Sequence, residues 1–465
     1  MKQEEIQRGA ECDGVKPPVR GWRAFAYAAV SAVVVLLPIA RILAKKVHDW
    51  FLVDLAAYCA VSRALFDGNN PFPDRMEFVN FLLKVDPSRT DVPIVYPGQM
   101  LLFAWPSYFY GDVLQAIYVL ANIFLVLFVT ALTLRKACGY SWRDIALPGK
   151  RQLVYAVCCF CFLSSACAMQ TMRLGQITVI LAFLFYGIFW FPKSAVCRTV
   201  SFAVIAVTKY SLLPVVAPLL FFKRHKLFCI TAFALFVVLS ISPMFFGNSL
   251  VEVYSGYAQA VRNIIQPGTV NHYSVNCNCC HLAFFRSDVL NAVMKGLVVC
   301  AIAWLLFRER KTTGISDTLM LLAFSLTFLV SYHGHHDYTL VFPLFFIRLF
   351  AFAKERKWAL FCGTAVFPAY FLVPSRIVEK VGSKIGAIPG LDSILWLAPS
   401  WDRQIPHIFP INGFLTVALF FWSLYLYFHV KNPYVFDILS RHADRDPRAA
   451  RHRQGVPRGA AEALP

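Results

Sequence analysis

The chain has 465 residues, of which 58% are hydrophobic, and a formal net charge of +19. Apolar runs long enough to cross a bilayer, which takes ~20 residues, recur along nearly its whole length. This pattern excludes an ordinary soluble domain and predicts an all-α polytopic membrane protein, because the alternating polarity of a transmembrane β-barrel is absent. The basic residues lie in short loops and in the tail, where they set topology. No nucleic-acid motif is visible, so no nucleic-acid partner is expected.

In chain order, residues 1–23 are predicted to be a cytoplasmic N-terminal segment without a cleavable signal peptide. A membrane domain covers 24–430, and 431–465 form a basic cytoplasmic tail with a disordered composition. Placing the basic clusters in the cytoplasm gives one consistent alternation of spans. The predicted spans are 24–44, 113–134, 152–169, 176–191, 227–245, 289–307, 317–332, 338–353, 358–373 and 408–429.

Two further apolar segments do not fit this alternation simply. Segment 199–222 is bounded by cytoplasmic charges and interrupted by polar residues and prolines, so it predicts a hairpin of two half-helices with Lys209 near its apex. Segment 94–110 is short and contains two prolines, which predicts an interfacial or partly inserted helix. Together these segments predict roughly 11–13 transmembrane helices with large extracytoplasmic loops, and we find no internal repeat.

The first and second large outer loops, 45–93 and 246–288, differ in character. The first is rich in aspartate and is predicted to be catalytic, whereas the second is polar and aromatic and holds three clustered cysteines, Cys277, Cys279 and Cys280. Those cysteines lack a second pair at zinc-like spacing, so a disulfide within the loop or free thiols is favoured over zinc. Their pairing stays open.

Asp54 is the first candidate for chemistry, because it lies shortly after the first span, at the predicted outer surface. At an ordinary aspartate pKa of ~3.9 it would be ionised, which suits a base. The alternative is a solvated loop carboxylate, since six aspartates share the loop, and Asp49 and Asp67 are the neighbours to exclude.

Candidate phosphate-binding residues are basic or histidine side chains near span ends. Arg173 is a guanidinium at the outer face and suits a phosphate, or it is an interfacial anchor. Lys209 is an intramembrane lysine, which indicates function unless it snorkels to the interface. His333, His335 and His336 could bind a phosphate or a metal, and their spacing lacks the helical i, i+4 pair, so phosphate is favoured. No cofactor is expected, and a divalent metal ion stays open.

Candidate substrate-binding residues occupy the same outer side. Tyr58 follows Asp54 by four residues, and Tyr96 precedes a proline that suits a helix start. Gln176 begins the span after Arg173, and Asn276 and Arg286 are polar residues of the second large loop.

Taken in order, these motifs resemble glycosyltransferase family 87, of GT-C fold, which includes polyprenyl-phosphate-mannose-dependent mannosyltransferases. The likeness runs from about residue 20 to about 430 and departs from the family's Tyr-Pro-Pro at Tyr96-Pro97-Gly98. The motifs are Asp54-Leu-x-x-Tyr58, Gly68-Asn-Asn-Pro-Phe72, Tyr96-Pro97, Leu174-Gly175-Gln176, Lys209-Tyr-Ser-Leu-Leu-Pro214 and His335-His336-Asp337-Tyr338 with Pro343.

The resemblance implies an inverting hexosyltransferase, with Asp54 as general base and a histidine, His335 or His336, near the donor phosphate. Lys209 and Gln176 would face the central cavity. The implied partners are a polyprenyl-phosphate sugar donor, a lipid or glycan acceptor and membrane lipids, and the oligomeric state is undetermined. The implied location is the bacterial plasma (inner) membrane, with the active site on the extracytoplasmic side. The alternative is a transporter or flippase of a lipid-linked or anionic substrate, although such proteins usually show internal repeats.

Overall fold

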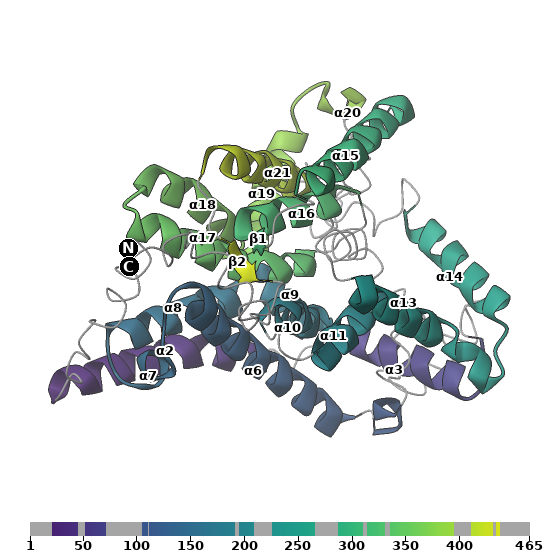
Figure 1. Ribbon diagram of the computed structural model, residues 1–465, viewed down its shortest axis with the longest axis horizontal. Helices are drawn as coiled ribbons and strands as arrows, with labels where there is room; N and C mark the ends of the chain where they lie inside the picture. Colours follow the sequence, from purple (N-terminus) through teal and green to yellow (C-terminus); the bar gives the residue numbers. More distant parts are fainter. Residues whose placement is uncertain are drawn as a thin grey trace, which may run out of the picture. The chain divides into compact units, whose positions relative to one another are not determined.

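The described part of the chain is almost entirely helical (Figure 1). The computed structural model describes residues 21–44, 52–70, 105–109, 111–190, 195–208, 226–265, 287–309, 314–330, 335–394, 411–430 and 434–437. The chain divides into two compact units. The first comprises Met1–Ala56, Phe109–Ile180 and His335–Val378, and the second comprises Ala57–Tyr108, Leu181–Gly334 and Glu379–Pro465.

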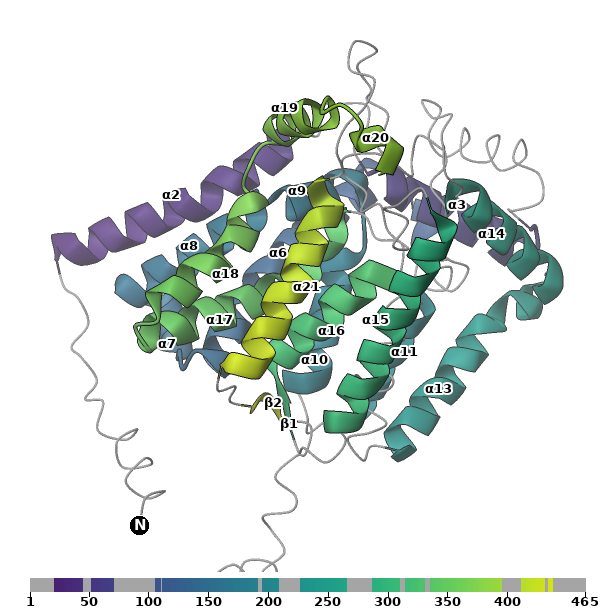
Figure 2. The same cartoon turned by 90° about the horizontal axis from the view of Figure 1, so that it is seen from above.

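The first unit is a set of apolar helices packed around aromatic side chains. Helix α2 lies against α8 (Figure 2), α6 contacts α8 and α17, and α17 contacts α18. Phe162 stacks on Phe342 with ring centroids 5.0 Å apart, and Phe345 stacks on Phe367 at 6.1 Å. The elements are α2 (Trp22–Ala44), α6 (Asp112–Ala137), α7 (Trp142–Ala146), α8 (Lys150–Ser164), α9 (Ala166–Leu174), the 3-10 helix η6 (His335–Val341), α17 (Phe342–Lys354) and α18 (Trp358–Tyr370).

Ser165 divides what the sequence predicts as one span, 152–169, into two helices. Helices α8 and α9 meet at a 59° bend. Ser165 is extended, its hydroxyl accepts a hydrogen bond from the Ala168 N–H at 3.2 Å, and it donates to the Phe162 carbonyl at 2.6 Å. A side chain that caps the second helix while bonding the first satisfies backbone groups that the break exposes. The bend therefore gives α9 its own direction.

The second unit is also built of paired helices. Helix α16 packs on α21 and α15, and α11 packs on α13. Strands β1 and β2, which the sequence analysis did not predict, pair antiparallel with Ile315 opposite Phe436. The elements are η3 (Pro106–Phe109), α11 (Ala195–Thr208), α13 (Lys226–Ser240), η5 (Ser242–Phe246), α14 (Leu250–Ile265), α15 (Asp288–Glu309), β1 (Gly314–Ser316), α16 (Asp317–Val330), α20 (Leu391–Ile394), α21 (Ile411–His429) and β2 (Tyr434–Asp437). Among the described elements, α3 (Val53–Phe66), α10 (Thr178–Trp190) and α19 (Ser375–Gly386) cross the boundary between the units, and the last residue of η3, Phe109, belongs to the first unit.

The helices have the character of a membrane protein. Among the described residues, α2 and α6 are long and apolar enough to span a bilayer, and up to four spans result if each bent pair counts as one. Helices α10, α11, α15, α16, α18 and α21 contribute shorter apolar stretches. The all-α class is thus confirmed, whereas the count of roughly 11–13 spans and the GT-C arrangement stay predictions.

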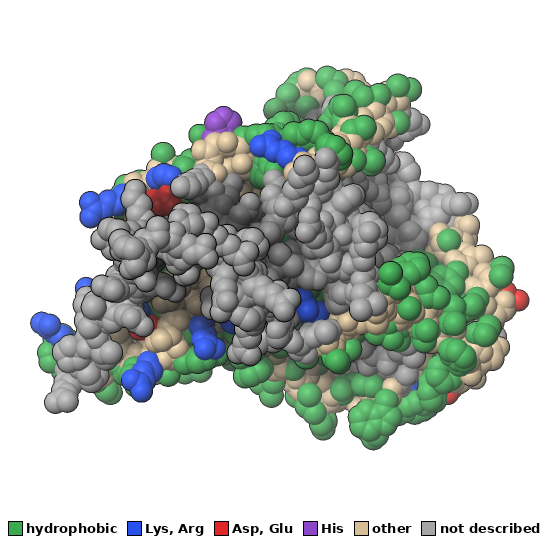
Figure 3. Space-filling view, in the orientation of Figure 1, with side chains coloured by type: hydrophobic (Ala, Val, Ile, Leu, Met, Phe, Trp, Pro, Cys, Tyr) green, Lys and Arg blue, Asp and Glu red, His purple; other side chains and the backbone are tan. Residues whose placement is uncertain are grey.

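Exposed hydrophobic side chains support contact with lipid. Figure 3 shows hydrophobic side chains on the surface formed by α13 and α14, and they include Ile230, Phe233, Val238 and Val251. A water-soluble surface rarely carries so many large apolar side chains together. These helices therefore fit a hydrocarbon environment.

The unusual segments are described only in part. Helix α11 covers 195–208, the start of the expected hairpin, whereas Lys209 and the rest of 199–222 lie outside the described residues. Of segment 94–110, only 105–109 is described, and it contains the short helix η3. The three loop cysteines, the second large outer loop from 266 to 286 and the tail after residue 437 also lie outside the described residues.

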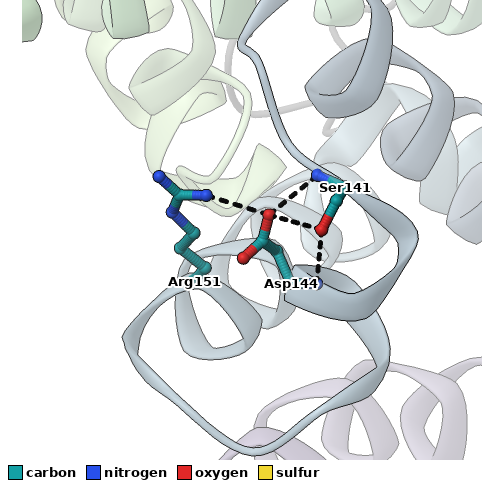
Figure 4. A network of polar contacts seen from close by, with 3 residues as sticks. All are labelled: Ser141, Asp144 and Arg151. Carbon is teal, nitrogen blue, oxygen red and sulfur yellow. Dashed lines mark hydrogen bonds and ion pairs between the residues drawn. The ribbon is translucent and has the colours of Figure 1, made fainter. Parts of the chain in front are cut away.

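A polar network holds the short loop between α6 and α8 (Figure 4). The carboxylate of Asp144 accepts hydrogen bonds from the N–H and the hydroxyl of Ser141, both at 2.8 Å, and from the guanidinium of Arg151 at 2.9 Å. Ser141 in turn caps α7, which completes a capping box. Partial burial would raise the pKa of Asp144, but the hydrogen bonds from Ser141 and Arg151 outweigh it and hold that pKa below its usual 3.8.

Asp144→Ala should lower the stability of the protein by about 1 kcal/mol at neutral pH, because it removes the capping box. The folded carboxyl has the lower pKa, so its contribution is present above the usual value of 3.8 and is lost as pH falls through the folded value. Thermal unfolding in detergent, followed by tryptophan fluorescence, should show the difference from wild type closing on acidification. Arg143→Ala, on the same helix, is the control, and an equal loss in both variants would contradict the assignment.

Candidate active site

Asp54 lies in the first turn of a helix rather than in an open loop. Helix α3 begins at Val53, and the side chain of Asp54 is only 4% exposed. The N-terminal end of a helix favours a carboxylate, because unpaired N–H groups give it partial positive charge. Within the loop that the sequence predicts, Asp54 is therefore a structured, buried carboxylate, unlike Asp67, which forms an exposed pair with Arg63.

The chain enters this helix through a constrained residue. Leu52 has φ of 62°, a left-handed conformation that bulky residues seldom adopt, and it is fully buried. Its N–H donates to the Arg173 carbonyl at 2.6 Å, and its own carbonyl accepts from the Ala56 N–H at 3.0 Å. These two bonds fix the start of α3 against the end of α9.

Gly175 allows the two segments to approach. It ends α9 with φ of 75°, and the Gln176 N–H donates to the Thr171 carbonyl at 2.9 Å, as in a Schellman turn. A Cβ at this position would lie 2.8 Å from the Cβ of Leu55 and 3.0 Å from its nitrogen. Glycine is thus required here both for its backbone conformation and for the space it leaves.

This close approach brings Gln176 to Asp54, although 122 residues separate them in the sequence. The side-chain amide Nε2 of Gln176 donates a hydrogen bond to Oδ2 of Asp54. The sequence analysis placed Gln176 among the substrate-binding residues. In the structure its amide is bonded to the carboxylate, and its substrate-binding role stays a prediction.

Arg173 lies on the same turn, with its side chain exposed. It occupies the last turn of α9, where a positive charge is favourable. Within the described parts of the chain, no side chain pairs with its guanidinium. A guanidinium that is accessible and not neutralised by a neighbour can bind a phosphate.

The helix η6 packs against α9 on the same unit. Oγ1 of Thr339 lies 3.3 Å from Oγ1 of Thr171, and the buried ring of Tyr338 packs against Phe371 at 4.9 Å. Asp337 is 1% exposed. The backbone of His335 and His336 belongs to η6, whereas their side chains lie outside the described part. The histidine-containing turn is therefore held beside the helix that carries Arg173.

Of the other site residues predicted from the sequence, only Tyr58 has a described side chain. Tyr58 is buried in α3, one helical turn after Asp54. The residues outside the described part of the chain are Tyr96, Lys209, Asn276, Arg286 and His333. Among the described residues, no three His, Cys, Asp or Glu side chains group in a way that could hold a metal ion.

Several residues of this site escaped the sequence analysis. Leu52, Thr171 and Thr339 carry no signal of their own, since their role depends on contacts between distant segments. Arg348, which belongs to α17 and not to this contact, did carry a signal, because it interrupts the apolar run of that helix. It is 1% exposed and lies over the ring of Phe352 at 5.6 Å. A buried charge in an apolar helix indicates function by default.

The first unit holds two groups that group transfer requires, a proton acceptor and a cation that can bind a phosphate. A fixed carboxylate can accept a proton from a hydroxyl, and an exposed guanidinium can neutralise a phosphate. Both are positioned by the contact between the end of α9 and the start of α3. This combination suits the transfer of a group from a phosphate to a hydroxyl.

Comparison with known proteins agrees with this chemistry. The model for glycosyltransferase family 87 matches residues 95–331, about half of the chain. The matched range contains Arg173 and Gln176, whereas Asp54 precedes it and η6 follows it. No match was found among curated proteins or among solved structures.

Gly175→Ala should destabilise the protein by at least about 1 kcal/mol more than Gly139→Ala. Both glycines have positive φ, 75° and 74°, but a Cβ at Gly139 meets nothing within 4 Å. The control therefore carries the backbone cost alone, and the difference between the variants reports the contact with Leu55. Thermal unfolding of the two purified variants measures it, and equal melting temperatures would contradict the close approach.

Proposed function

Because the chain belongs to glycosyltransferase family 87, we propose that it is an inverting hexosyltransferase that uses a polyprenyl-phosphate sugar. The acceptor is an extracytoplasmic lipid or glycan, and mannose is the first sugar to test. The observation that supports the proposal most is the buried Asp54 held by the amide of Gln176. The family favours glycosyl transfer over the alternative of a transporter or flippase.

In the proposed reaction, Asp54 is the general base. The acceptor oxygen attacks the anomeric carbon while Asp54 takes the hydroxyl proton, and the bond from that carbon to the phosphate oxygen breaks on the opposite face. The polyprenyl phosphate leaves with the electron pair, so the configuration inverts. A positioned base contributes about 10²–10⁴ in rate. Aspartate is a weak base, but it suffices when proton transfer is late and the attacking hydroxyl has become acidic.

The leaving phosphate needs positive charge. Arg173 is the described residue that suits this role, because its guanidinium is exposed on the turn bonded to Leu52. We assign Lys209 and the histidines His333, His335 and His336 to the same phosphate. The packing of η6 on α9 supports the histidine assignment.

The other substrate contacts follow from sequence position. Tyr58, Tyr96, Asn276 and Arg286 are assigned to the sugar and the acceptor. No cofactor is required by the proposed chemistry, and a divalent metal ion is a variable for the assay. The proposed location is the plasma (inner) membrane of a bacterium, with the site on the extracytoplasmic side.

Asp54→Asn should lower the rate of sugar transfer by at least ~10²-fold, because it removes the base while keeping size and hydrogen bonding. The assay incubates membranes containing the protein with radiolabelled polyprenyl-phosphate mannose and measures a new labelled glycolipid. Asp67→Asn is the matched control, since Asp67 lies at the exposed end of the same helix. Near-normal turnover by Asp54→Asn would contradict the assignment. Labelled substrate crossing sealed vesicles without a new bond would favour a transporter.

Gln176→Leu should lower kcat about tenfold or more with little change in KM for the donor, because it frees the carboxylate without removing a donor contact. Gln176→Glu should be at least as damaging, since it places a second carboxylate against Asp54. Gln170→Leu, which makes the same change within α9 before the glycine turn, is the control. A rise in KM alone for Gln176→Leu would show instead that Gln176 binds substrate directly.

A further inference from the structure

Helix α19 combines an apolar face with a row of basic residues. It spans Ser375–Gly386 and contains lysines at 380 and 384, four residues apart. Arg376 precedes them by another four residues, so the three positions share one side of the helix. Ile377 and Val381 lie on one side of this row, and Glu379 and Ser383 lie on the other, so the helix carries three basic residues and one acidic residue. This pattern of apolar and basic faces is typical of helices that lie in a membrane interface.

The exposed fractions show which side of the helix faces outward. Val378 is only 8% exposed, so it packs against protein. Ile377 and Val381 are 51% and 46% exposed, and both Lys380 and Lys384 are exposed. One continuous strip therefore offers two aliphatic side chains beside two ammonium groups. Exposed aliphatic side chains beside a basic row are the arrangement that an interfacial helix presents to lipid headgroups.

The short connection between α18 and α19 limits how far α19 can lie from the hydrocarbon layer of the membrane. Helix α18, an apolar helix, ends at Tyr370, and only Phe371–Pro374 separate it from the start of α19 (Figure 2). Four residues reach at most about 14 Å even when fully extended. If α18 lies in the hydrocarbon layer, the start of α19 is confined to the adjoining interface. Exposed apolar side chains continue beyond the helix at Ile388 and Ile394.

From these three observations we propose that α19 is a membrane-surface helix that binds anionic phospholipid headgroups through Lys380 and Lys384. Ile377 and Val381 insert beside the headgroups, and the lysine stems follow the apolar surface while their ammonium groups reach the phosphates. The charges of the helix match an anionic rather than a zwitterionic surface. Each lysine near such a surface contributes about fivefold in affinity. The proposal does not depend on the sugar-transfer chemistry.

The test uses photo-crosslinking of the full chain in vesicles. A diazirine-bearing amino acid is placed at Val381, and the protein is reconstituted in phosphatidylcholine with about one part in four of phosphatidylglycerol. Mass spectrometry then counts the adducts with each lipid. We expect phosphatidylglycerol to be enriched severalfold over its share of the bilayer, and the enrichment to fall as salt is raised. A label at Ile377 provides the same readout if the first position impairs folding.

Variants decide whether the lysines cause the enrichment. In Lys380→Gln/Lys384→Gln the adducts should return to the bulk lipid ratio. Lys354→Gln/Lys357→Gln removes the same charge at the opposite end of α18, from the end of α17 and the loop that follows it, and it should keep the enrichment. Adducts at the bulk ratio in the unmodified chain would overturn the lipid-selective role. Adducts to protein without any lipid would show that another protein covers this face, and would overturn the proposal entirely.

Discussion

The candidate site depends on the contact between the end of α9 and the start of α3. Two left-handed residues meet there, Gly175 and Leu52, and the N–H of Leu52 bonds the carbonyl of Arg173. A left-handed leucine is costly, and it persists only where its surroundings hold it. Here the surroundings are the glycine turn and its hydrogen bond. Everything that we assign to chemistry in the described residues, from Asp54 to Gln176 and Arg173, follows from this approach.

The hydrogen bond to Asp54 comes from a neutral amide and not from a cation, which bears on how easily the carboxylate can take up a proton. A buried carboxylate without hydrogen bonds would be strongly unfavourable, so some donor is needed. Gln176 supplies a neutral amide, which orients the carboxylate without adding charge. A guanidinium in the same place would favour the ionised carboxylate strongly and oppose its protonation. The available guanidinium, on Arg173, is exposed and is thereby left for an anionic ligand. In the proposed site, the two roles of orienting the carboxylate and binding a phosphate thus fall on separate side chains of one turn.

Hydropathy was sufficient to locate most helices but not their ends or their breaks. The span predicted at 24–44 corresponds to α2, and that at 113–134 corresponds to α6, because long apolar runs have few alternatives in a membrane. The bend at Ser165 was missed, since a serine within an apolar run also fits a straight helix. Helix α3 was missed as well, because its apolar residues were placed in a loop by the charges around them. Asp54 was singled out by its position after the first span and then by family resemblance, and no local pattern could reveal its bond to a residue 122 positions away.

The bend between α8 and α9 has a physical reason in the thickness of the bilayer. The two helices together run from Lys150 to Leu174, and a straight helix of that length would be about 37 Å long. The hydrocarbon core is only ~30 Å thick, so such a helix would have to tilt or extend its end into the headgroups. Bending by 59° at Ser165 allows the last nine residues, Ala166–Leu174, to turn aside instead. In the proposed reaction, this bend would keep the glycine turn that meets α3 near the interface, where we expect the lipid-borne donor and the acceptor to meet. In this proposal, the 59° break at Ser165, which hydropathy does not reveal, is what positions the candidate site.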